Sequence, residues 1–226
     1  MMVCATVMFA GCNKDGNNEP TPAANGGGQT AAGWVDLGLP SGLLWATCNL
    51  GATSPDGYGD YYAWGETATK DVYGWSTYKY CNGTTMTKYC NNSSYGYNGF
   101  TDNLTTLEAM DDAAAQKLGA GARMPTAAEW RELIYNTTAE WTQVNGVNGR
   151  KFTAANGNSL FLPAAGVRDG SGLYNAGLIG FYWSSSLYGS YYPGDAWGFN
   201  FNPDDQGMGN SGRYIGLSVR AVRSQN

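Results

Sequence analysis

The chain contains no histidine among its 226 residues. Without an imidazole it cannot assemble a Ser-His-Asp triad, a Cys-His dyad or a histidine-ligated metal site. Charged residues are few, at 14%, and its lysines and arginines form no cluster. Nucleic-acid partners require a basic patch, so we expect none. No apolar run reaches 18 residues, so the sequence predicts no membrane-spanning helix.

Aromatic residues and glycine are abundant instead. Aromatics make up 14% of the chain, with 16 Tyr and 8 Trp, and there are 33 glycines. Disordered chains carry few aromatics and much charge, so this composition indicates a folded, loop-rich protein. The net charge is −5. Without a leader and linker about 190 residues remain, which is enough for one domain with a core.

Residues 1–12 read as a processing signal. The apolar stretch 3–10 is followed by Gly11 and Cys12, and small residues before a cysteine resemble the lipobox of bacterial lipoproteins. We expect a lipidated Cys12 and an exported protein anchored to the outer membrane, facing the cell surface. An ordinary N-terminus with a small buried cysteine is the alternative. Residues 13–33 read as a flexible linker, which leaves 34–226 as the domain.

Three cysteines remain after this leader. Cys81 and Cys90 bracket a polar loop and could form a disulfide in an oxidising compartment, although two free thiols are an equal alternative. Cys48 lies on the same alternation face as Leu44 and Ala46, which indicates a small buried residue.

Two helices are expected in the middle of the chain. A capping box formed by Thr105 and Glu108 would start the first, with Asp111 and Asp112 on its solvated face. Its apolar positions would be Leu107, Met110, Ala114 and Leu118. Thr126 and Glu129 form a second capping box, and the apolar face of the following helix would be Ala127, Trp130, Leu133 and Ile134.

The remaining segments read as strands and loops. Residues 65–104 are rich in Gly, Asn, Ser and Tyr and predict long ordered loops. Asn156-Gly157 is a hairpin signal between two short strands. The order of elements indicates an α+β fold with an antiparallel sheet. The expected strands are 34–37, 43–50, 61–64, 151–153, 160–162, 181–185, 196–201 and 217–222.

In segment 181–223, apolar residues that suit a protein core alternate with positions whose residue type the core does not dictate. These positions hold Tyr, Ser, Gly, Asp and Asn, the residues of antibody combining loops, and predict binding of a protein or glycan rather than catalysis. Strand alternation would bury Trp197, Phe199 and Phe201 and display the intervening residues. The candidate ligand-binding residues are Tyr188, Ser190, Tyr191, Asp195, Gly198, Asn200, Asn202, Asp204, Asp205, Asn210, Ser211 and Tyr214.

Several longer motifs are similar to one known family, the Fibrobacter succinogenes major paralogous domain family, over roughly residues 34–223. That family is similar to the C-type lectin fold shared by formylglycine-generating enzymes and the variable proteins of diversity-generating retroelements. The resemblance implies two helices packed on a twisted antiparallel sheet with long loops. We assign Arg168, Trp183 and Arg220 to the scaffold. The motifs are 35–49, 123–126 with Glu129 and Trp130, 162–166 with Arg168, 182–186 and 218–220.

The resemblance also implies a mechanism for the free positions in 181–223. In retroelement variable proteins, reverse transcription that mutates template adenines converts Asn codons into Tyr, Ser, Gly, Asp or Ile codons, and the free positions fit this set. The alternative is an unvaried family member whose loops simply hold loop residues. A surface-assembly or adhesin subunit is a second alternative.

An enzymatic reading has less support. Formylglycine-generating enzymes depend on a cysteine pair late in the domain, and this chain has no cysteine after Cys90, so the resemblance does not transfer their activity. The acid pairs Asp204 with Asp205, and Asp60 with Glu66, read most simply as solvated loop residues. Calcium would require Asp195, Asn202, Asp204 and Asp205 to cluster. We therefore expect no catalytic residue, no metal and no cofactor.

Overall fold

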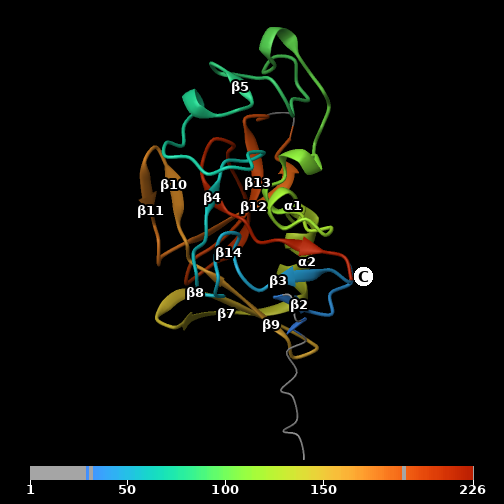
Figure 1. The fold of residues 1–226 in the computed structure, drawn as a ribbon, viewed down its shortest axis with the longest axis vertical. Helices are drawn as coiled ribbons and strands as arrows, with labels where there is room; N and C mark the ends of the chain where they lie inside the picture. Colours follow the sequence, from blue (N-terminus) through green and yellow to red (C-terminus); the bar gives the residue numbers. More distant parts are fainter. Residues whose placement is uncertain (1–28, 31–32, 190–191, 226) are drawn as a thin grey trace, which may run out of the picture.

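The computed structural model describes residues 29–30, 33–189 and 192–225 and has an α+β fold, as predicted (Figure 1). The predicted signal residue Cys12 lies outside the described residues. Among the described residues, no helix is long and apolar enough to cross a membrane. The helices are α1 (Ala113–Leu118) and α2 (Ala127–Asn136), with 3-10 turns η1 (Trp75–Thr77), η2 (Tyr97–Gly99) and η3 (Ala109–Asp111).

The described strands form one five-stranded sheet, one four-stranded sheet, one three-stranded sheet and two small hairpins. The strands are β1 (Gln29–Thr30), β2 (Trp34–Asp36), β3 (Leu44–Ala46), β4 (Tyr61–Tyr62), β5 (Cys81–Asn82), β6 (Thr85–Met86), β7 (Thr137–Val144), β8 (Val147–Ala154), β9 (Ser159–Pro163), β10 (Val167–Asp169), β11 (Gly172–Tyr174), β12 (Gly180–Leu187), β13 (Asp195–Phe201), β14 (Gln206–Gly212), β15 (Leu217–Ser218) and β16 (Val222–Arg223).

The central sheet has the order β14-β13-β12-β15-β4. Strands β13 and β14 pair in antiparallel register along their whole length. Strand β14 was not predicted, because its sequence QGMGNSG has little strand propensity. Its pairing with β13, whose Phe199 and Phe201 are buried, holds it in the sheet.

The predicted strand 217–222 is divided between two sheets. Strand β15 pairs in parallel with β12, whereas β16 pairs with β3 in the sheet β1-β2-β3-β16. Between them, Arg220 is completely buried and donates to Asn49 Oδ1 at 2.7 Å and to the carbonyls of Ala46 and Phe161. The Arg220 side chain therefore links β3 of the four-stranded sheet to β9 of the three-stranded sheet.

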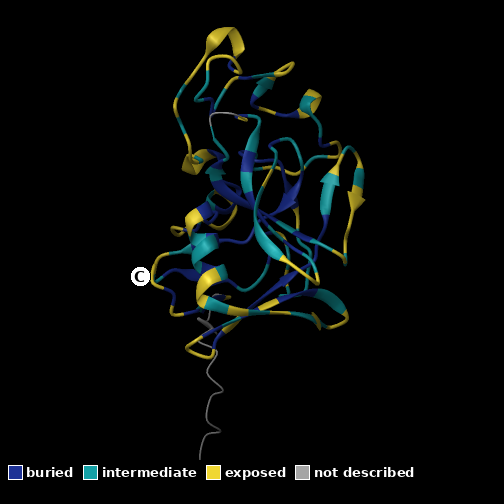
Figure 2. Ribbon diagram, turned by 180° about the vertical axis from the view of Figure 1, so that it is seen from behind, coloured by how far each residue is buried: buried dark blue, intermediate teal, exposed yellow. Residues whose placement is uncertain are grey.

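The core lies on both faces of the central sheet, and the buried segments gather in the middle of the molecule (Figure 2). Adjacent residues of β12 point to opposite faces, with Tyr182 in one cluster and Trp183 in the other. On the Tyr182 side, Trp130 of α2 stacks on Phe199 with ring centroids 5.0 Å apart. Trp183 is completely buried and donates its indole N–H to the Tyr62 carbonyl at 2.7 Å.

Helix α2 begins as predicted. Thr126 is the N-cap, and the reciprocal bonds with Glu129 complete a capping box. Arg123 adds a bidentate ion pair to the Glu129 carboxylate, at 2.6 and 2.7 Å. Ala127, Trp130 and Leu133 are buried, as the apolar periodicity indicated.

The prediction for the first helix was wrong in its start and its apolar face. Thr105 to Leu107 are hydrogen-bonded to strand β12, because the N–H of Leu107 donates to Ser185 and the Thr105 carbonyl accepts from Leu187. The N-cap is Asp112, whose Oδ1 accepts from the N–H groups of Ala114 and Ala115. The helix therefore starts eight residues after Thr105, at Ala113, and Met110 and Leu118 are exposed.

Asp111 and Asp112 are buried rather than solvated. The Asp111 carboxylate accepts from the hydroxyls of Tyr80 and Tyr89 and forms ion pairs with Lys88 at 2.6 Å and Lys79 at 3.4 Å. Burial raises the pKa of Asp111, but the hydrogen bonds from Lys88 and the two tyrosines outweigh it and lower the pKa to about 2. This network attaches segment 75–104 to the start of α1.

Of the two alternatives for Cys81 and Cys90, the structure has the free thiols and not the disulfide. The Cys81 thiol lies 3.0 Å from the Trp75 carbonyl, and the Cys90 thiol lies 3.2 Å from the Asn92 carbonyl. Each sulfur is thus engaged locally, and both cysteines are free. Cys48 is half-buried rather than fully buried.

Segment 75–104 forms a lobe at one end of the molecule, around the β5–β6 hairpin (Figure 1). It is ordered as predicted but includes η1, η2 and this hairpin. Many of its residues are exposed (Figure 2). Tyr192 and Gly194, which precede β13, lie beside this lobe, because they line a cavity together with Trp75 and Met86.

Candidate functional site

The candidate ligand-binding residues separate to the two ends of the β13–β14 hairpin. Asp195 begins β13 and pairs with Gly212 at the end of β14, whereas Phe201 pairs with Gln206 beside the hairpin turn. Strands rise about 3.3 Å per residue, so the two ends lie about 20 Å apart. Residues at both ends cannot contact one small ligand.

At the turn end, the predicted residues stabilise the backbone. Asn202 Oδ1 accepts from the N–H groups of Asp204 at 2.8 Å and Asp205 at 2.9 Å. Arg150 donates to the carbonyl of Pro203 at 3.2 Å. Asp204 and Asp205 are exposed, and Asp195 lies at the far end of the strand. The four residues considered for calcium therefore do not cluster.

In the middle of β13, the display of Gly198 was predicted wrongly. Gly198 is buried, and a Cβ atom there would lie 3.0 Å from the Tyr182 carbonyl and 3.7 Å from Leu217. Alternation does continue along β13, but both faces of this strand are covered by core. Asn200 is half-buried, and a Cβ at Gly209 would lie 2.7 Å from its amide nitrogen.

At the other end, several predicted residues come together beside the lobe. The Asp195 carboxylate accepts from the side-chain amide of Asn210 at 2.6 Å. Tyr214 packs against Trp75, with ring centroids 4.8 Å apart. Tyr188 packs on Trp197 at 4.6 Å. Ser211 is half-buried opposite Ala196, and the predicted residues Ser190 and Tyr191 lie outside the described residues.

A cavity of about 210 Å³ opens between the lobe and the start of β13, and we call it the apical hollow. Its aromatic walls are accessible, since Tyr192 is 60% exposed and Tyr95 is 41% exposed. Asp195 is the charged residue of this lining. The hollow is lined by Trp75, Thr84, Met86, Tyr95, Tyr192, Gly194 and Asp195.

Aromatic rings continue outward from the hollow. Tyr192 lies 6.5 Å from Tyr188, which contacts Trp197, and the Arg131 guanidinium lies 4.8 Å from the Trp197 ring. On the opposite wall, a Cβ at Gly194 would lie 3.3 Å from the Trp75 ring. Glycine at 194 thus allows the indole to approach the backbone closely.

Arg213 fixes the frame of the apical hollow. It is completely buried, and its guanidinium donates to the Tyr78 hydroxyl and to the carbonyls of Lys88, Tyr89 and Pro193 at 2.8 to 3.1 Å. The Arg213 guanidinium also lies 4.9 Å from the Trp64 ring. One side chain therefore connects the lobe to the β12–β13 connection.

Sequence reasoning missed Trp75, Tyr95 and Arg213. The first two belong to the loops of 65–104, where aromatic residues among Gly and Asn were the available signal. Arg213 lies inside the candidate segment beside the chosen Tyr214, but an isolated arginine gives no sign of being buried. Its role depends on acceptors from three separate segments.

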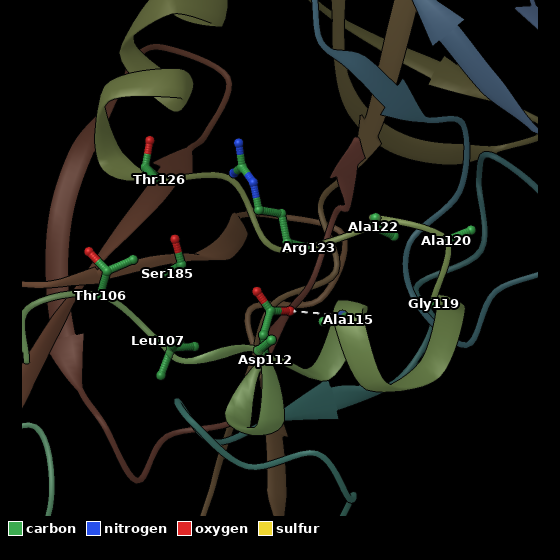
Figure 3. Close-up of a pocket in the computed structure, with 12 residues that line it drawn as sticks. Thr106, Leu107, Asp112, Ala115, Gly119, Ala120, Ala122, Arg123, Thr126 and Ser185 are labelled. Atoms are coloured by element: carbon green, nitrogen blue, oxygen red, sulfur yellow. Dashed lines mark hydrogen bonds between the residues drawn. The ribbon is translucent and has the colours of Figure 1, made fainter. Parts of the chain in front are cut away.

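A larger cavity, about 460 Å³, lies beside α1 between Asp112, Arg123 and Ser185 (Figure 3). Asp112 projects into it, but its two oxygens accept from the N–H groups of Ala114, Ala115 and Met124. Burial raises the pKa of Asp112, against the effect of these hydrogen bonds. Arg123 is occupied by Glu129. The polar groups of this cavity thus serve the fold.

The paired acids do not form a two-carboxylate site. Asp60 accepts from the Tyr62 hydroxyl at 3.2 Å, whereas Glu66 forms an ion pair with Lys70 at 2.8 Å. Within the described residues, no group of three or more Cys, Asp or Glu side chains could hold a metal ion. The described site is best suited to binding through aromatic contact and a few polar bonds.

A scan of models of known protein families finds no match to this chain, and searches of curated proteins and of solved structures find none either.

Proposed function

We propose that this chain is a binding protein that recognises a protein or glycan ligand at the apical hollow, and that it is not an enzyme. The observation that carries the proposal is that Trp75, Tyr95 and Tyr192 line one cavity together with Asp195. Exposed aromatic rings at the centre of a contact surface supply most of the binding energy in many complexes.

The lining defines what the ligand must offer. Tyr95 and Tyr192 provide ring faces for an apolar surface, such as the CH face of a sugar or a proline or aromatic side chain. Asp195 is held by Asn210 at 2.6 Å, so its carboxylate is already positioned to accept from a hydroxyl or amide. A positioned group binds with a smaller entropic cost than a mobile one.

We further propose that the fold is C-type-lectin-like. The supporting features are two helices, an antiparallel hairpin within the central sheet and long loops gathered at one end. Under retroelement diversification, the positions that change ligand choice would be those beside the hollow, namely Asp195, Asn210, Ser211 and Tyr214. Gly198 and Asn202 would instead affect folding.

Export and lipid attachment through Cys12 are part of this proposal. Strand β2 follows the predicted linker and lies in the half of the molecule away from the lobe (Figure 1). An anchor ahead of β2 would therefore leave the apical hollow facing away from the membrane. Palmitate labelling of the expressed full chain, compared with Cys12→Ser, tests the lipidation.

The binding proposal is tested on a glycan array and by pull-down from host and bacterial surface extracts, followed by titration of the bound molecule. Tyr192→Ala and Asp195→Asn should each weaken binding at least tenfold with little change in melting temperature. Tyr135→Ala is the matched control, because Tyr135 is 80% exposed on α2. A ligand that binds Tyr192→Ala, Asp195→Asn and wild type equally would overturn the assignment of the site.

A surface-assembly subunit is the second candidate. It is favoured by the exposed apolar side chains of Leu173, Tyr174 and Leu178 on and after β11. Light scattering over a range of protein concentrations distinguishes the two. An assembly subunit would form oligomers that Tyr174→Ser disrupts, whereas a monomer at all concentrations argues for the binding protein.

A further inference from the structure

A third cavity, about 500 Å³, lies between β4 and the β10–β11 hairpin. It shares no lining residue with the apical hollow. Its size is within the usual range for small-molecule sites. The groups that matter for its chemistry are Asp60, Tyr61, Lys70, Asp71, Tyr73 and Arg168.

Arg168 is held in place but has free donors. Its N–H and carbonyl exchange hydrogen bonds with Gly216, each at 2.9 Å, and it pairs with Leu173 in the hairpin. Its guanidinium lies 5.3 Å from the Tyr61 ring centroid. Among the described residues, no side-chain hydrogen bond or ion pair engages this guanidinium. A fixed guanidinium with free N–H groups is well suited to bind a carboxylate.

The floor under Arg168 is rigid. Tyr61 and Tyr73 are buried, and their hydroxyls donate to the carbonyls of Ala165 at 2.5 Å and Tyr61 at 2.6 Å respectively. Burial raises the pKa of Tyr61 to about 12, although the nearby Arg168 opposes this. Both rings therefore remain neutral and keep their orientation at physiological pH.

The other charged side chains of the cavity differ in how free they are to contact a ligand. Lys70 is neutralised by Glu66 at 2.8 Å and also donates to the Thr77 carbonyl at 3.0 Å. The Asp60 carboxylate is fixed, because one oxygen accepts from Tyr62 and the group packs on Gly51, where a Cβ would lie 2.4 Å away. Asp71 is exposed and in no ion pair with the described residues.

We propose that this cavity binds a small zwitterion, an α-amino acid, with its carboxylate on Arg168 and its ammonium facing Asp60 and Asp71. A simple anion would meet the two carboxylates, and a simple cation would meet the guanidinium. A ligand with both charges close together satisfies each wall. This site is independent of the binding function proposed for the apical hollow.

The test uses the full chain and the proteinogenic α-amino acids as probes, each titrated by calorimetry and by chemical-shift changes. Wild type should bind at least one of them with a Kd below about 1 mM. The N-acetylated form, which lacks the ammonium, and the decarboxylated amine should each bind at least tenfold more weakly. Arg168→Gln should abolish binding, and Asp71→Asn should weaken it.

Two further variants make the result specific. Arg223→Gln is the matched control, because the Arg223 guanidinium also lies over a ring, 4.6 Å from the Trp34 centroid, outside this cavity. Arg223→Gln and Tyr192→Ala should both retain amino-acid binding. The proposal is overturned by the absence of binding for every amino acid at about 10 mM, by equal binding of the N-acetylated form, or by unchanged binding in Arg168→Gln.

Discussion

The guanidinium of Arg213 donates to the carbonyl oxygen of Pro193 at 2.8 Å. This bond crosses from the end of β14 to the β12–β13 connection that supplies Tyr192 and Gly194 to the apical hollow. The same guanidinium holds Lys88 and Tyr89 of the lobe through their carbonyls. The two walls of the hollow are thus positioned by one buried cation.

Arg213→Lys should therefore destabilise the protein by about 3 kcal/mol, since an ammonium keeps the buried charge but cannot reach all of these acceptors. Urea denaturation measures this change. Arg223→Lys, at a half-buried arginine over Trp34, should cost less than about 1 kcal/mol. Equal stability of Arg213→Lys and wild type would contradict this account of the frame.

Glycines of the β13–β14 hairpin should respond differently to substitution. Gly198→Asn should cost about 2 kcal/mol, because a Cβ there would meet the Tyr182 carbonyl at 3.0 Å. Gly207→Asn should change stability by less than about 0.5 kcal/mol, since a Cβ there would have no atom within 4 Å apart from those of Gly207 and its two chain neighbours. Thermal unfolding of the two variants measures the difference, and a tolerated Gly198→Asn would return this position to the displayed set.

The two ends of the hairpin should also separate stability from binding. Asn202→Ala should cost about 1 kcal/mol, because its Oδ1 accepts two backbone hydrogen bonds in the turn. Its affinity for the ligand of the apical hollow should be unchanged. Denaturation and titration of the same preparation test both statements, and loss of affinity in a folded Asn202→Ala would place the site at the turn.

Acid stability should depend on Asp111. Its pKa is lowered to about 2 from the ordinary value of 3.8, so the unfolded state binds more protons between these values and stability falls as the pH decreases. The contribution is fully present above about pH 4 and is lost toward pH 2. The pKa of Asp112 is raised by burial, so the contribution of Asp112 to stability increases as the pH decreases.

Asp111→Asn isolates the effect. It should lower stability at pH 7 and flatten the loss of stability between pH 4 and 2 that wild type shows. Unfolding free energies measured at several pH values provide the comparison. An acid limb of unchanged slope in Asp111→Asn would mean that other carboxylates control it.

A local signal was read correctly where no distant segment competed with it, and contacts with distant partners were not predicted. Thr126 and Glu129 are three residues apart and define the start of α2 by themselves. Asp111 instead obtains its environment from Lys88 and Tyr89 in an earlier segment, so nothing near it in the chain indicates burial. The capping box expected at Thr105 failed because β12 supplies competing hydrogen bonds.

The candidate site follows the same division. Asp195 and Tyr214 were chosen for their residue types and do lie at the hollow or against its wall. Asn202 and Asp205 were chosen on the same grounds and occupy a turn, because residues that suit binding loops also suit tight turns. The residues at the hollow and the residues in the turn are told apart only by the register of β13 with β14, which places them at opposite ends of the hairpin.

Strand β3 pairs with β2 near the start of the domain and with β16 near its end. The two ends of the domain therefore lie in one sheet. Both ends of the domain consequently emerge from one half of the molecule, away from the lobe (Figure 1). A bead, a biotin acceptor peptide or a fluorescent protein can therefore be attached at either end without covering the apical hollow. Immobilisation through the N-terminal end and immobilisation through the C-terminal end should both leave the apical hollow open to a ligand.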